Sequence, residues 1–303
     1  MAILVVGSIG LDNIKTPFGE VKNLLGGSAV HFSVAASIVG EVRLVGVVGK
    51  DFNESYIKYL EKRHIDLEGL EIKEGKTFHW EGYYEYDMNH AHTVKTELNV
   101  FQHFKPKIPE RYKNSEYVFL ANIDPFLQLE VLRQIKSPKL IVADTMNYWI
   151  ESKREMLLEV IKKIDIMLLN DSEARELMRT PNLVKAAKKI MSLGPKTVII
   201  KKGEHGAIMF NSNNSIFIAP AFPLEDLIDP TGAGDSFAGG MISFLSKQDV
   251  INEMNLRKAV VFGTVIASFT VQNFGTKALD NITYNDIKLR YRQLSKFTSF
   301  SDL

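Results

Sequence analysis

Small residues and carboxylates are concentrated in the segment Ile228–Gly240, which reads IDPTGAGDSFAGG. Gly232, Ala233 and Gly234 leave their backbone N–H groups open to an anion, and a helix beginning there adds the positive end of its dipole. Asp235 follows at once. Because a carboxylate repels phosphate, its expected use is to take a proton from a hydroxyl that attacks the phosphate. The alternative is a glycine turn with Asp235 as a plain helix cap.

The remaining chain supplies elements that could position such a site. Apolar runs typical of buried strands alternate with stretches of helical periodicity, which indicates an α/β fold with a predominantly parallel central sheet and helices on both faces. We expect a single domain over residues 1–303. Strands are expected at Ile3–Val6, Arg43–Val48, Tyr117–Leu120, Leu140–Ala143, Ile166–Leu169 and Thr197–Lys201. Helices are expected at Gly27–Val39, Phe52–Arg63, Phe126–Ile135, Lys153–Ile164, Glu173–Met178 and Val184–Ser192.

Several polar residues and glycines follow the ends of these expected strands. Ligands of parallel sheets bind beyond the carboxyl ends of the strands, so residues placed there are expected to converge on one cleft. The residues in question are Gly7, Asn122, Asp144, Asn170 and Gly203.

Two segments lack helical periodicity. Asn13–Leu25 is short, polar and rich in turn residues. Gly75–Phe104 is rich in aromatic residues, Thr and His, with strand-like stretches at Thr77–Tyr86 and Thr93–Phe101. We expect the two segments to form a small β lid beside the α/β body.

The composition excludes several classes of protein. Of the 303 residues, 45% are hydrophobic, which is enough for a sizeable core, and the net charge of +1 gives no basis for a nucleic-acid or membrane partner. Since the chain has no cysteine, disulfides and thiolate chemistry are excluded. The first apolar run lacks a preceding basic region, and no stretch approaches the roughly 20 apolar residues of a membrane span. A soluble cytoplasmic protein is therefore expected.

The glycine-rich segment resembles the second signature of the ribokinase-like (PfkB) carbohydrate kinase family, Asp-Thr-x-Gly-Ala-Gly-Asp, with Pro230 in the second place. The resemblance implies that Asp235 is the catalytic base and that the backbone of Gly232, Ala233 and Gly234 forms the anion hole. It also implies the ribokinase-like fold, in which a β lid covers the substrate and often serves as a dimer surface. Thr231 is then expected beside the nucleotide phosphates.

Two further segments resemble the parts of the family that hold the phosphoryl acceptor. Asp12 follows the first strand in a segment whose spacing fails the dinucleotide-binding fingerprint, and the family has an aspartate here that binds sugar hydroxyls. The alternative is a turn aspartate. Gly26 and Gly27 resemble the first signature, Gly-Gly-x-x-x-Asn, although His31 replaces the asparagine. A flexible hinge is the alternative for the glycine pair.

The metal site is expected at Asn170 and Glu173, which match the family's Asn-x-x-Glu motif. The resemblance associates that motif with magnesium, for which oxygen ligands are suited, often through water. The same residues also fit an N-cap with acidic residues in the first helical turn.

The nucleotide is expected near Lys201, Gly203 and Gly206, which resemble the family's nucleotide-binding loop, although an ordinary hairpin turn fits as well. Asn273 lies in the region that lines the adenine pocket of the family. Many members also hold potassium with carbonyls at the position of Asp229.

The function that these resemblances imply is Mg-ATP-dependent transfer of the γ-phosphoryl group to a hydroxyl, a primary CH₂OH of a sugar or sugar derivative. A nucleoside kinase of the same fold is the alternative; it needs an aromatic stacking surface, for which the lid offers Phe78, Trp80, Tyr83 and Tyr84. A non-catalytic nucleotide or sugar sensor is an alternative of another class, disfavoured by Asp235. A dehydrogenase is disfavoured by the missing fingerprint.

Overall fold

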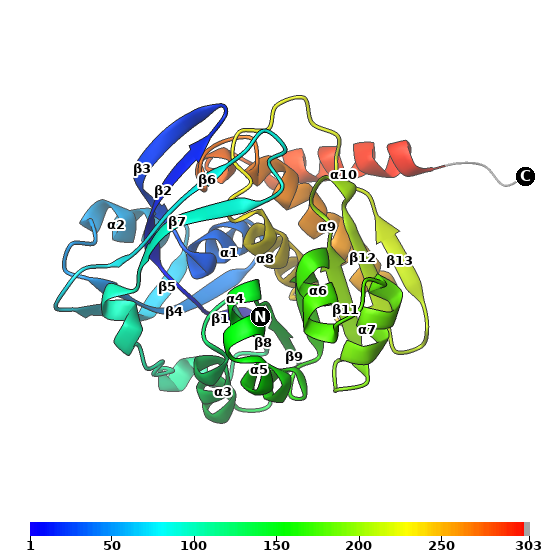
Figure 1. Cartoon of the computed structure of the whole chain (residues 1–303), viewed down its shortest axis with the longest axis horizontal. Coiled ribbons are helices and arrows are strands. Elements are labelled where there is room, and N and C mark those ends of the chain that lie inside the picture. Colours follow the sequence, from blue (N-terminus) through cyan, green and yellow to red (C-terminus); the bar gives the residue numbers. More distant parts are fainter. Residues whose placement is uncertain (300–303) are drawn as a thin grey trace, which may run out of the picture.

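A nine-stranded sheet forms the centre of the molecule, with β1 (Ala2–Val6) in its interior (Figure 1). The computed structural model describes residues 1–299, so the last four residues of the predicted domain lie outside the described part. The strand order is β13-β12-β11-β10-β9-β8-β1-β4-β5. The other strands are β4 (Glu41–Gly49), β5 (Ile65–Lys73), β8 (Tyr117–Leu120), β9 (Leu140–Ala143), β10 (Ile166–Asn170), β11 (Thr197–Lys201), β12 (Ala207–Asn211) and β13 (Ile216–Ala219).

The sheet is parallel from β5 to β11, and only β12 and β13 add antiparallel pairs at one edge. The chain builds outward from β1 to β4 and β5 on one side, and then from β8 to β11 on the other. This reversal makes the gap between β1 and β8 a topological switch point, which is where parallel sheets bind ligands. The predicted predominantly parallel sheet is confirmed.

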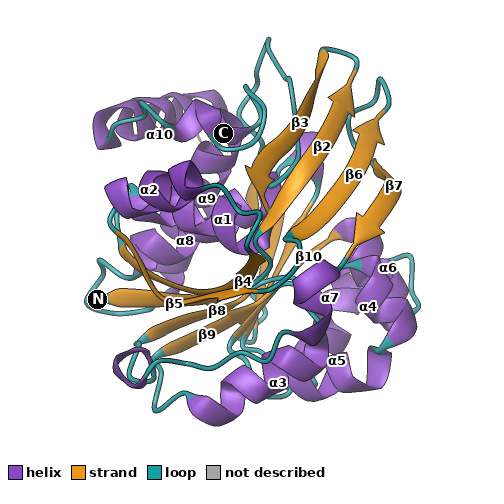
Figure 2. Cartoon of the chain, turned by 90° about the vertical axis from the view of Figure 1, so that its left-hand side faces the viewer, coloured by secondary structure: helices purple, strands orange, loops and turns teal. Residues whose placement is uncertain are grey.

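Both faces of the sheet are buried, as expected for a parallel sheet. Along β1, Ile3 and Val5 pack into one hydrophobic core, and Leu4 and Val6 pack into the other. Figure 2 shows the two helical layers above and below the sheet. One layer contains α1 (Ser28–Ser37), α2 (Glu54–Lys62), α8 (Ala233–Leu245), α9 (Glu253–Thr270) and α10 (Tyr284–Thr298). The other contains α3 (Pro125–Gln134), α4 (Asn147–Ser152), α5 (Arg154–Ile161), α6 (Asp171–Met178) and α7 (Leu183–Met191).

A second sheet of four strands stands at a steep angle beside the first and forms the lid (Figure 2). Its order is β3-β2-β6-β7, with β2 parallel to β6 and the outer pairs antiparallel. The strands are β2 (Gly10–Thr16), β3 (Gly19–Gly26), β6 (Phe78–Tyr84) and β7 (Ala91–Glu97). The predicted β lid is confirmed. The strand expected at Thr93–Phe101 ends earlier, since Asn99–His103 forms a 3₁₀-helix.

The two faces of the lid differ in burial. Asp12, Ile14 and Thr16 of β2 are buried, whereas Lys15 is exposed, so alternate residues face the body and the solvent. We call these the inner and outer faces of the lid. Residues in register share a face, and Trp80 pairs with Asp12, so the inner face of β6 carries Trp80. No helix within residues 1–299 is long and apolar enough to cross a bilayer.

Candidate functional site

The predicted anion hole lies where α8 begins. Gly232 precedes the helix with a φ of +74°, a left-handed conformation that favours glycine. The N–H group of Ala233 donates to the carbonyl of Pro230 at 3.1 Å, so this member of the predicted hole is already engaged. No hydrogen bond from the N–H groups of Gly232 and Gly234 occurs in the described part of the chain, and both groups remain for an anion.

Asp235 lies in the first turn of α8 and is half-buried. Burial raises the pKa of Asp235 to about 8, and the charges of Asp144 and Asp12 act in the same direction, while Lys201 opposes them. The groups that shift this pKa come from distant segments of the chain, so the fold places Asp12, Asp144 and Lys201 near Asp235. A carboxyl group whose pKa lies near neutrality is suited to exchange protons with a hydroxyl.

The ammonium group of Lys201 lies between the end of β11 and the first turn of α8. It forms an ion pair of 2.5 Å with Asp144, which follows β9. It also lies so near α8 that a Cβ atom on Gly234 would be only 2.9 Å from Lys201 Nζ. Lys201 is therefore placed at the predicted anion hole, as its assignment to the phosphates requires.

Asn170 and Glu173 form a capping box at the start of α6. The Asn170 side chain accepts from the N–H of Glu173 at 2.8 Å, and Glu173 accepts from the N–H of Asn170 at 2.6 Å. The simpler alternative, an N-cap, thus describes the local geometry, and it leaves the metal assignment a prediction. Burial raises the pKa of Glu173, and the Asp144 charge adds to this effect.

The surroundings of Glu173 fit a magnesium ion. Residues 1–299 contain no cluster of three or more His, Cys, Asp or Glu side chains arranged to hold a metal. However, magnesium commonly keeps several waters and uses only one or two carboxylates besides phosphate oxygens. The carboxylates of Asp144, Glu173 and Asp235 surround the single ammonium group of Lys201, and this surplus of negative charge suits a divalent cation.

Gly26 and Gly27, which are predicted to lie beside the phosphoryl acceptor, let the backbone pack closely against Asp12 and Ser8. A Cβ atom on Gly26 would lie 1.9 Å from Asp12 Oδ2, and one on Gly27 would lie 2.5 Å from the carbonyl oxygen of Ser8. Gly27 has a φ of +94° and caps α1. Burial and the nearby Asp229 charge raise the pKa of Asp12 to about 7. The glycines therefore fix Asp12 and the start of α1.

His31 fills the space between α1 and the phosphate turn. A Cβ atom on Gly232 would lie only 2.1 Å from His31 Nδ1, so glycine at position 232 is what admits the imidazole. His31 is 2% exposed, and neither ring nitrogen has a hydrogen-bond partner among residues 1–299. Burial lowers the pKa of His31 to about 4, so the ring is neutral. Two unpaired nitrogens in a buried ring leave a donor and an acceptor for a bound molecule.

Asp229 is fully buried beneath the phosphate turn. Its carboxylate accepts from the N–H groups of Thr231 at 2.9 Å and Gly275 at 3.2 Å. Thr231 also contacts the lid, because its hydroxyl lies 3.2 Å from the hydroxyl of Tyr84. Thr231 thus joins the phosphate turn to the lid, while the potassium site predicted near Asp229 stays a prediction.

The predicted nucleotide loop is the turn that joins β11 to the antiparallel β12, so the hairpin alternative describes its geometry. Gly203 and Gly206 both have positive φ, +54° and +82°, which this turn requires. The tip of the lid reaches the loop, since Asn89 Nδ2 is 3.4 Å from a carboxylate oxygen of Glu204. Asn273 is exposed just after α9, with its side chain accepting from the next N–H at 2.8 Å.

The structure adds two residues to the predicted site, Asp144 and Tyr84. In the sequence Asp144 is marked only as a cleft-lining residue beyond a strand end, and Tyr84 only as one of four lid aromatics. A partner for Lys201 is not visible in the sequence, because Asp144 belongs to another strand, separated from β11 by β10.

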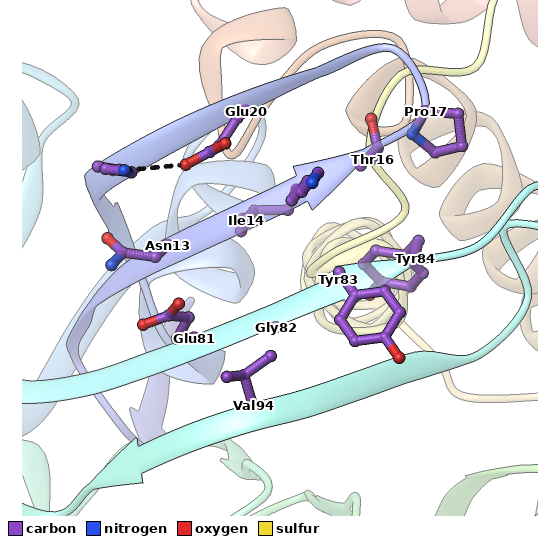
Figure 3. A pocket seen from close by; sticks show the side chains of 12 residues that line it. Asn13, Ile14, Thr16, Pro17, Glu20, Glu81, Gly82, Tyr83, Tyr84 and Val94 are labelled. Carbon is purple, nitrogen blue, oxygen red and sulfur yellow. Dashed lines mark ion pairs between the residues drawn. The ribbon is translucent and has the colours of Figure 1, made fainter.

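A groove of about 700 Å³ lies over the outer face of the lid, with α8 behind the strands (Figure 3). Tyr83 and Glu81 line it, together with Asn13 and Lys15 of β2. The groove is thus separated from the phosphate turn by the lid sheet itself.

Comparison with known proteins identifies the family. The family model described as "pfkB family carbohydrate kinase" matches residues 3–282. The chain therefore belongs to the pfkB family of carbohydrate kinases, and it is a phosphotransferase that acts on a hydroxyl group. The predicted family and enzyme class are confirmed.

Individual relatives include kinases of nucleosides and of sugars. A cytidine kinase of Thermococcus kodakarensis is 30% identical over 257 residues, which cover 83% of this chain and 91% of that protein. A nucleoside kinase of Methanocaldococcus jannaschii is 26% identical, covering 87% and 84%. The crystal structure of the M. jannaschii nucleoside kinase superposes with a TM-score of 0.77 over 96% of this chain and 98% of that one, at 23% identity. The ribokinase of Giardia lamblia has a TM-score of 0.80 at 18% identity, covering 98% and 99%. These structures confirm the ribokinase-like fold.

Proposed function

We propose that this protein is a nucleoside kinase that transfers the γ-phosphoryl group of Mg-ATP to a hydroxyl of the nucleoside, with Asp235 as general base. The observation that carries the proposal is the position of Asp235, which has a pKa near neutrality at the helix N-terminus where Gly232 and Gly234 keep free N–H groups. We propose a nucleoside rather than a simple sugar as the acceptor, because the charge of the acceptor site favours a neutral acceptor and the inner face of the lid favours a nucleoside.

Each residue of the site has a separate role in the proposed transfer reaction. Asp235 takes the hydroxyl proton as the oxygen attacks the γ-phosphorus, and the free N–H groups of α8 stabilise the charge on the transferring group. Lys201 contacts the phosphates from the side of β11. Asn170 and Glu173 would hold magnesium through water, and the ion would supply positive charge to neutralise the phosphates. The closed lid keeps water from competing with the acceptor.

The charge of the acceptor site favours a neutral acceptor. Asp12 and Asp229 lie close enough to influence each other, and Asp12 also affects Asp235. Within residues 1–299, no lysine or arginine is among the groups that shift the pKa of Asp12 or Asp229. A sugar acid or sugar phosphate would meet uncompensated negative charge there, whereas a nucleoside or a free sugar would not.

The inner face of the lid favours a nucleoside. Phe78 packs into the body against Phe101, and Tyr83 stacks on His92 on the outer face, so neither of these rings is free on the inner face. Trp80 remains beside Asp12. Its indole lies over Gly82, where a Cβ would be 2.3 Å from the ring, and its Nε1 donates to Thr93 Oγ1 at 3.1 Å. A flat ring fixed in this way is a stacking surface for a base.

The relatives support the same acceptor. The cytidine kinase of T. kodakarensis shares 30% of its residues with this chain over most of both proteins. A sugar kinase remains the second candidate, because His31 and Asp12 could hold the hydroxyls of a free sugar as well as those of a ribose. A non-catalytic sensor is a third, and it would gain nothing from a carboxylate beside phosphate.

The first experiment is an ADP-release assay with Mg-ATP over nucleosides, free sugars, sugar acids and sugar phosphates. Wild-type protein is compared with Asp235→Asn and Trp80→Leu. We expect a nucleoside to be the best acceptor, and turnover to fall by about 10³-fold or more in Asp235→Asn, with ATP binding retained. Trp80→Leu should raise KM for the nucleoside while leaving KM for ATP unchanged.

Each part of the proposal can fail separately. Retained turnover in Asp235→Asn would remove Asp235 as the base. A free sugar as best acceptor, with Trp80→Leu unchanged, would replace the nucleoside by a sugar. Binding of ATP without turnover of any acceptor would favour the sensor.

We also infer that the protein is a homodimer formed through the outer face of the lid. The observation behind this inference is that the large apolar side chains Tyr83 and Val94 are exposed on that face. A cytoplasmic location stays a prediction from the sequence, as does a potassium requirement.

A further inference from the structure

Asp144 belongs to a buried group of charges that the proposed transfer reaction does not yet explain. Its side chain is 6% exposed, and the Lys201 side chain that it contacts is 18% exposed. Glu173 and Asp235 also act on the same ammonium group. Within residues 1–299, the direct contact with this group comes from Asp144, through Oδ2 at 2.5 Å.

Stability does not account for this arrangement. Removing two charges from water costs several kcal/mol per ion in order-of-magnitude terms, and apolar residues of similar size often stabilise a fold equally well. Two further carboxylates beside the pair increase the repulsion. Buried charges kept in a cleft at such a cost are typical of functional sites.

The geometry shows what the pair does to Lys201. The lysine leaves the end of β11, and its ammonium group passes the end of β10 to reach Asp144, which follows β9. On this path Lys201 Nζ lies against Gly234, where a Cβ atom would be 2.9 Å away. The contact with Asp144 thus selects, from the many rotamers of a long flexible side chain, one that lies at the first turn of α8.

Asp144 is itself firmly held. Its Oδ1 accepts from the N–H of Thr145 at 2.9 Å, which leaves Oδ2 for the lysine. Its backbone N–H donates to the carbonyl of Leu120 at 3.0 Å. Gln128 of α3, 1% exposed, donates to the carbonyls of Asp144 at 3.1 Å and Ala121 at 2.9 Å. A carboxylate with a fixed orientation can impose that orientation on its partner.

We propose that Asp144 is a positioning residue, which holds the Lys201 ammonium group against the first turn of α8 so that it contacts the transferring phosphoryl group. The inference rests on the proposed function, because it takes α8 as the place of phosphoryl transfer. Asp144 acts through Lys201 and does not itself contact the phosphates. Burial tends to lower the pKa of Lys201, but the neighbouring carboxylates, Asp144 foremost, raise it, so the charge is kept.

The test is a double-mutant cycle with Asp144→Asn, Lys201→Met and the double variant, measured with the best acceptor of the wild-type protein. Removing one preorganised charge-stabilising group costs about 10² to 10³-fold in kcat, so we expect a loss of this size for Lys201→Met. Asp144→Asn should lower kcat about 10-fold or more, with KM for the acceptor changed less than about 3-fold. The double variant should be no slower than Lys201→Met, since Asp144 then has nothing to position.

Two outcomes would overturn the proposal. Multiplying losses in the double variant would mean that Asp144 acts independently of Lys201. An increase in the magnesium concentration needed for half-maximal rate, in Asp144→Asn but not in Lys201→Met, would make Asp144 a metal-binding residue instead. Failure of the proposed function is read separately, from turnover in Asp235→Asn.

Controls separate positioning from folding. Glu116→Gln removes a carboxylate that pairs with Lys139 at the amino ends of β8 and β9, away from the carboxyl ends where Asp144 lies, and it should leave kcat unchanged. Thermal melting of each variant reports folding. If Asp144→Asn does not fold, the smaller Asp144→Ser also removes the carboxylate; unchanged kcat in that folded variant would also contradict the positioning role.

Discussion

At the scale of the residue, the site depends on carboxyl groups that burial keeps from ionising easily. Asp12 and Asp235 both have a raised pKa, about 7 and about 8, and the Asp12 charge contributes to the shift of Asp235. The main cause is burial of the two groups, Asp12 on the inner face of the lid and Asp235 in the first turn of α8. A general base must be ionised to accept a proton, so, if Asp235 is the base as proposed, these surroundings set the pH range of the reaction.

The pH dependence of kcat/KM follows from the pKa of Asp235. Below about pH 8 the carboxyl group of the free enzyme is increasingly protonated, so kcat/KM should rise with pH, about tenfold per unit at the acid end, and level off above about pH 8. Steady-state rates between pH 5.5 and 9.5 measure this. An acid limb with a midpoint near pH 4, the value of an ordinary aspartate, would contradict the assignment of Asp235.

At the scale of the element, the lid contacts the body at two places, one on its inner face and one at its tip. Tyr84 reaches Thr231 in the phosphate turn, and Asn89 reaches Glu204 beside the predicted nucleotide loop. The same strand of the lid that carries Trp80 therefore also contacts the segment proposed to bind phosphate.

Tyr84→Phe tests the first of these contacts. The change removes one hydroxyl and its hydrogen bond, worth about 1 kcal/mol, so kcat/KM for the acceptor should fall about 5-fold. Tyr83→Phe is the matched control, because Tyr83 is the neighbouring residue on the outer face and stacks on His92 through its ring. Equal effects of the two substitutions in steady-state kinetics would exclude a specific role for the Tyr84–Thr231 contact.

The sequence predicts a strand best where a continuous apolar run is bounded by turn residues. The strands expected at Tyr117–Leu120, Leu140–Ala143 and Thr197–Lys201 match β8, β9 and β11, since each is a buried apolar run between turn residues. β5 (Ile65–Lys73) and β13 (Ile216–Ala219) were not expected. Both are edge strands. Charged residues interrupt the apolar ones in β5, and β13 is an apolar run of only four residues, of which Ala219 alone is buried.

For the candidate site, too, some features can be predicted from the sequence and others cannot. Residues within one motif, such as Gly232 and Asp235, are recognisable because they are adjacent in the sequence. The contact of His31 with Gly232 and the pair of Lys201 with Asp144 depend on packing between distant segments, and no local pattern encodes them.

At the scale of the whole molecule, the outer face of the lid is a sheet surface without a helical layer. Its exposed residues include Tyr83 at 37% and Val94 at 60%, beside Lys15 and Glu81 of the groove. Apolar residues that are exposed on a sheet face of this kind are often covered by a partner protein.

Light scattering tests the proposed dimer. We expect twice the 34.2 kDa mass of the chain, and a monomer for Val94→Glu, because a buried unpaired charge opposes association. Thr231→Val, which lies away from the outer face, should stay a dimer. A monomeric wild-type protein at micromolar concentration would contradict the dimer without affecting the kinase assignment.

The pairing of β2 with β6 has a consequence for how the chain folds. Gly10 pairs with Phe78, and α1, β4, α2 and β5 all lie between them in the sequence. The entropy of closing so long a loop is recovered only when the intervening elements have already packed on β1. We therefore expect the β2–β6 pairing, which joins the local pairs β2–β3 and β6–β7 into one sheet, to form late, after the first half of the body. During synthesis, the lid would then be completed only after the framework that supports it.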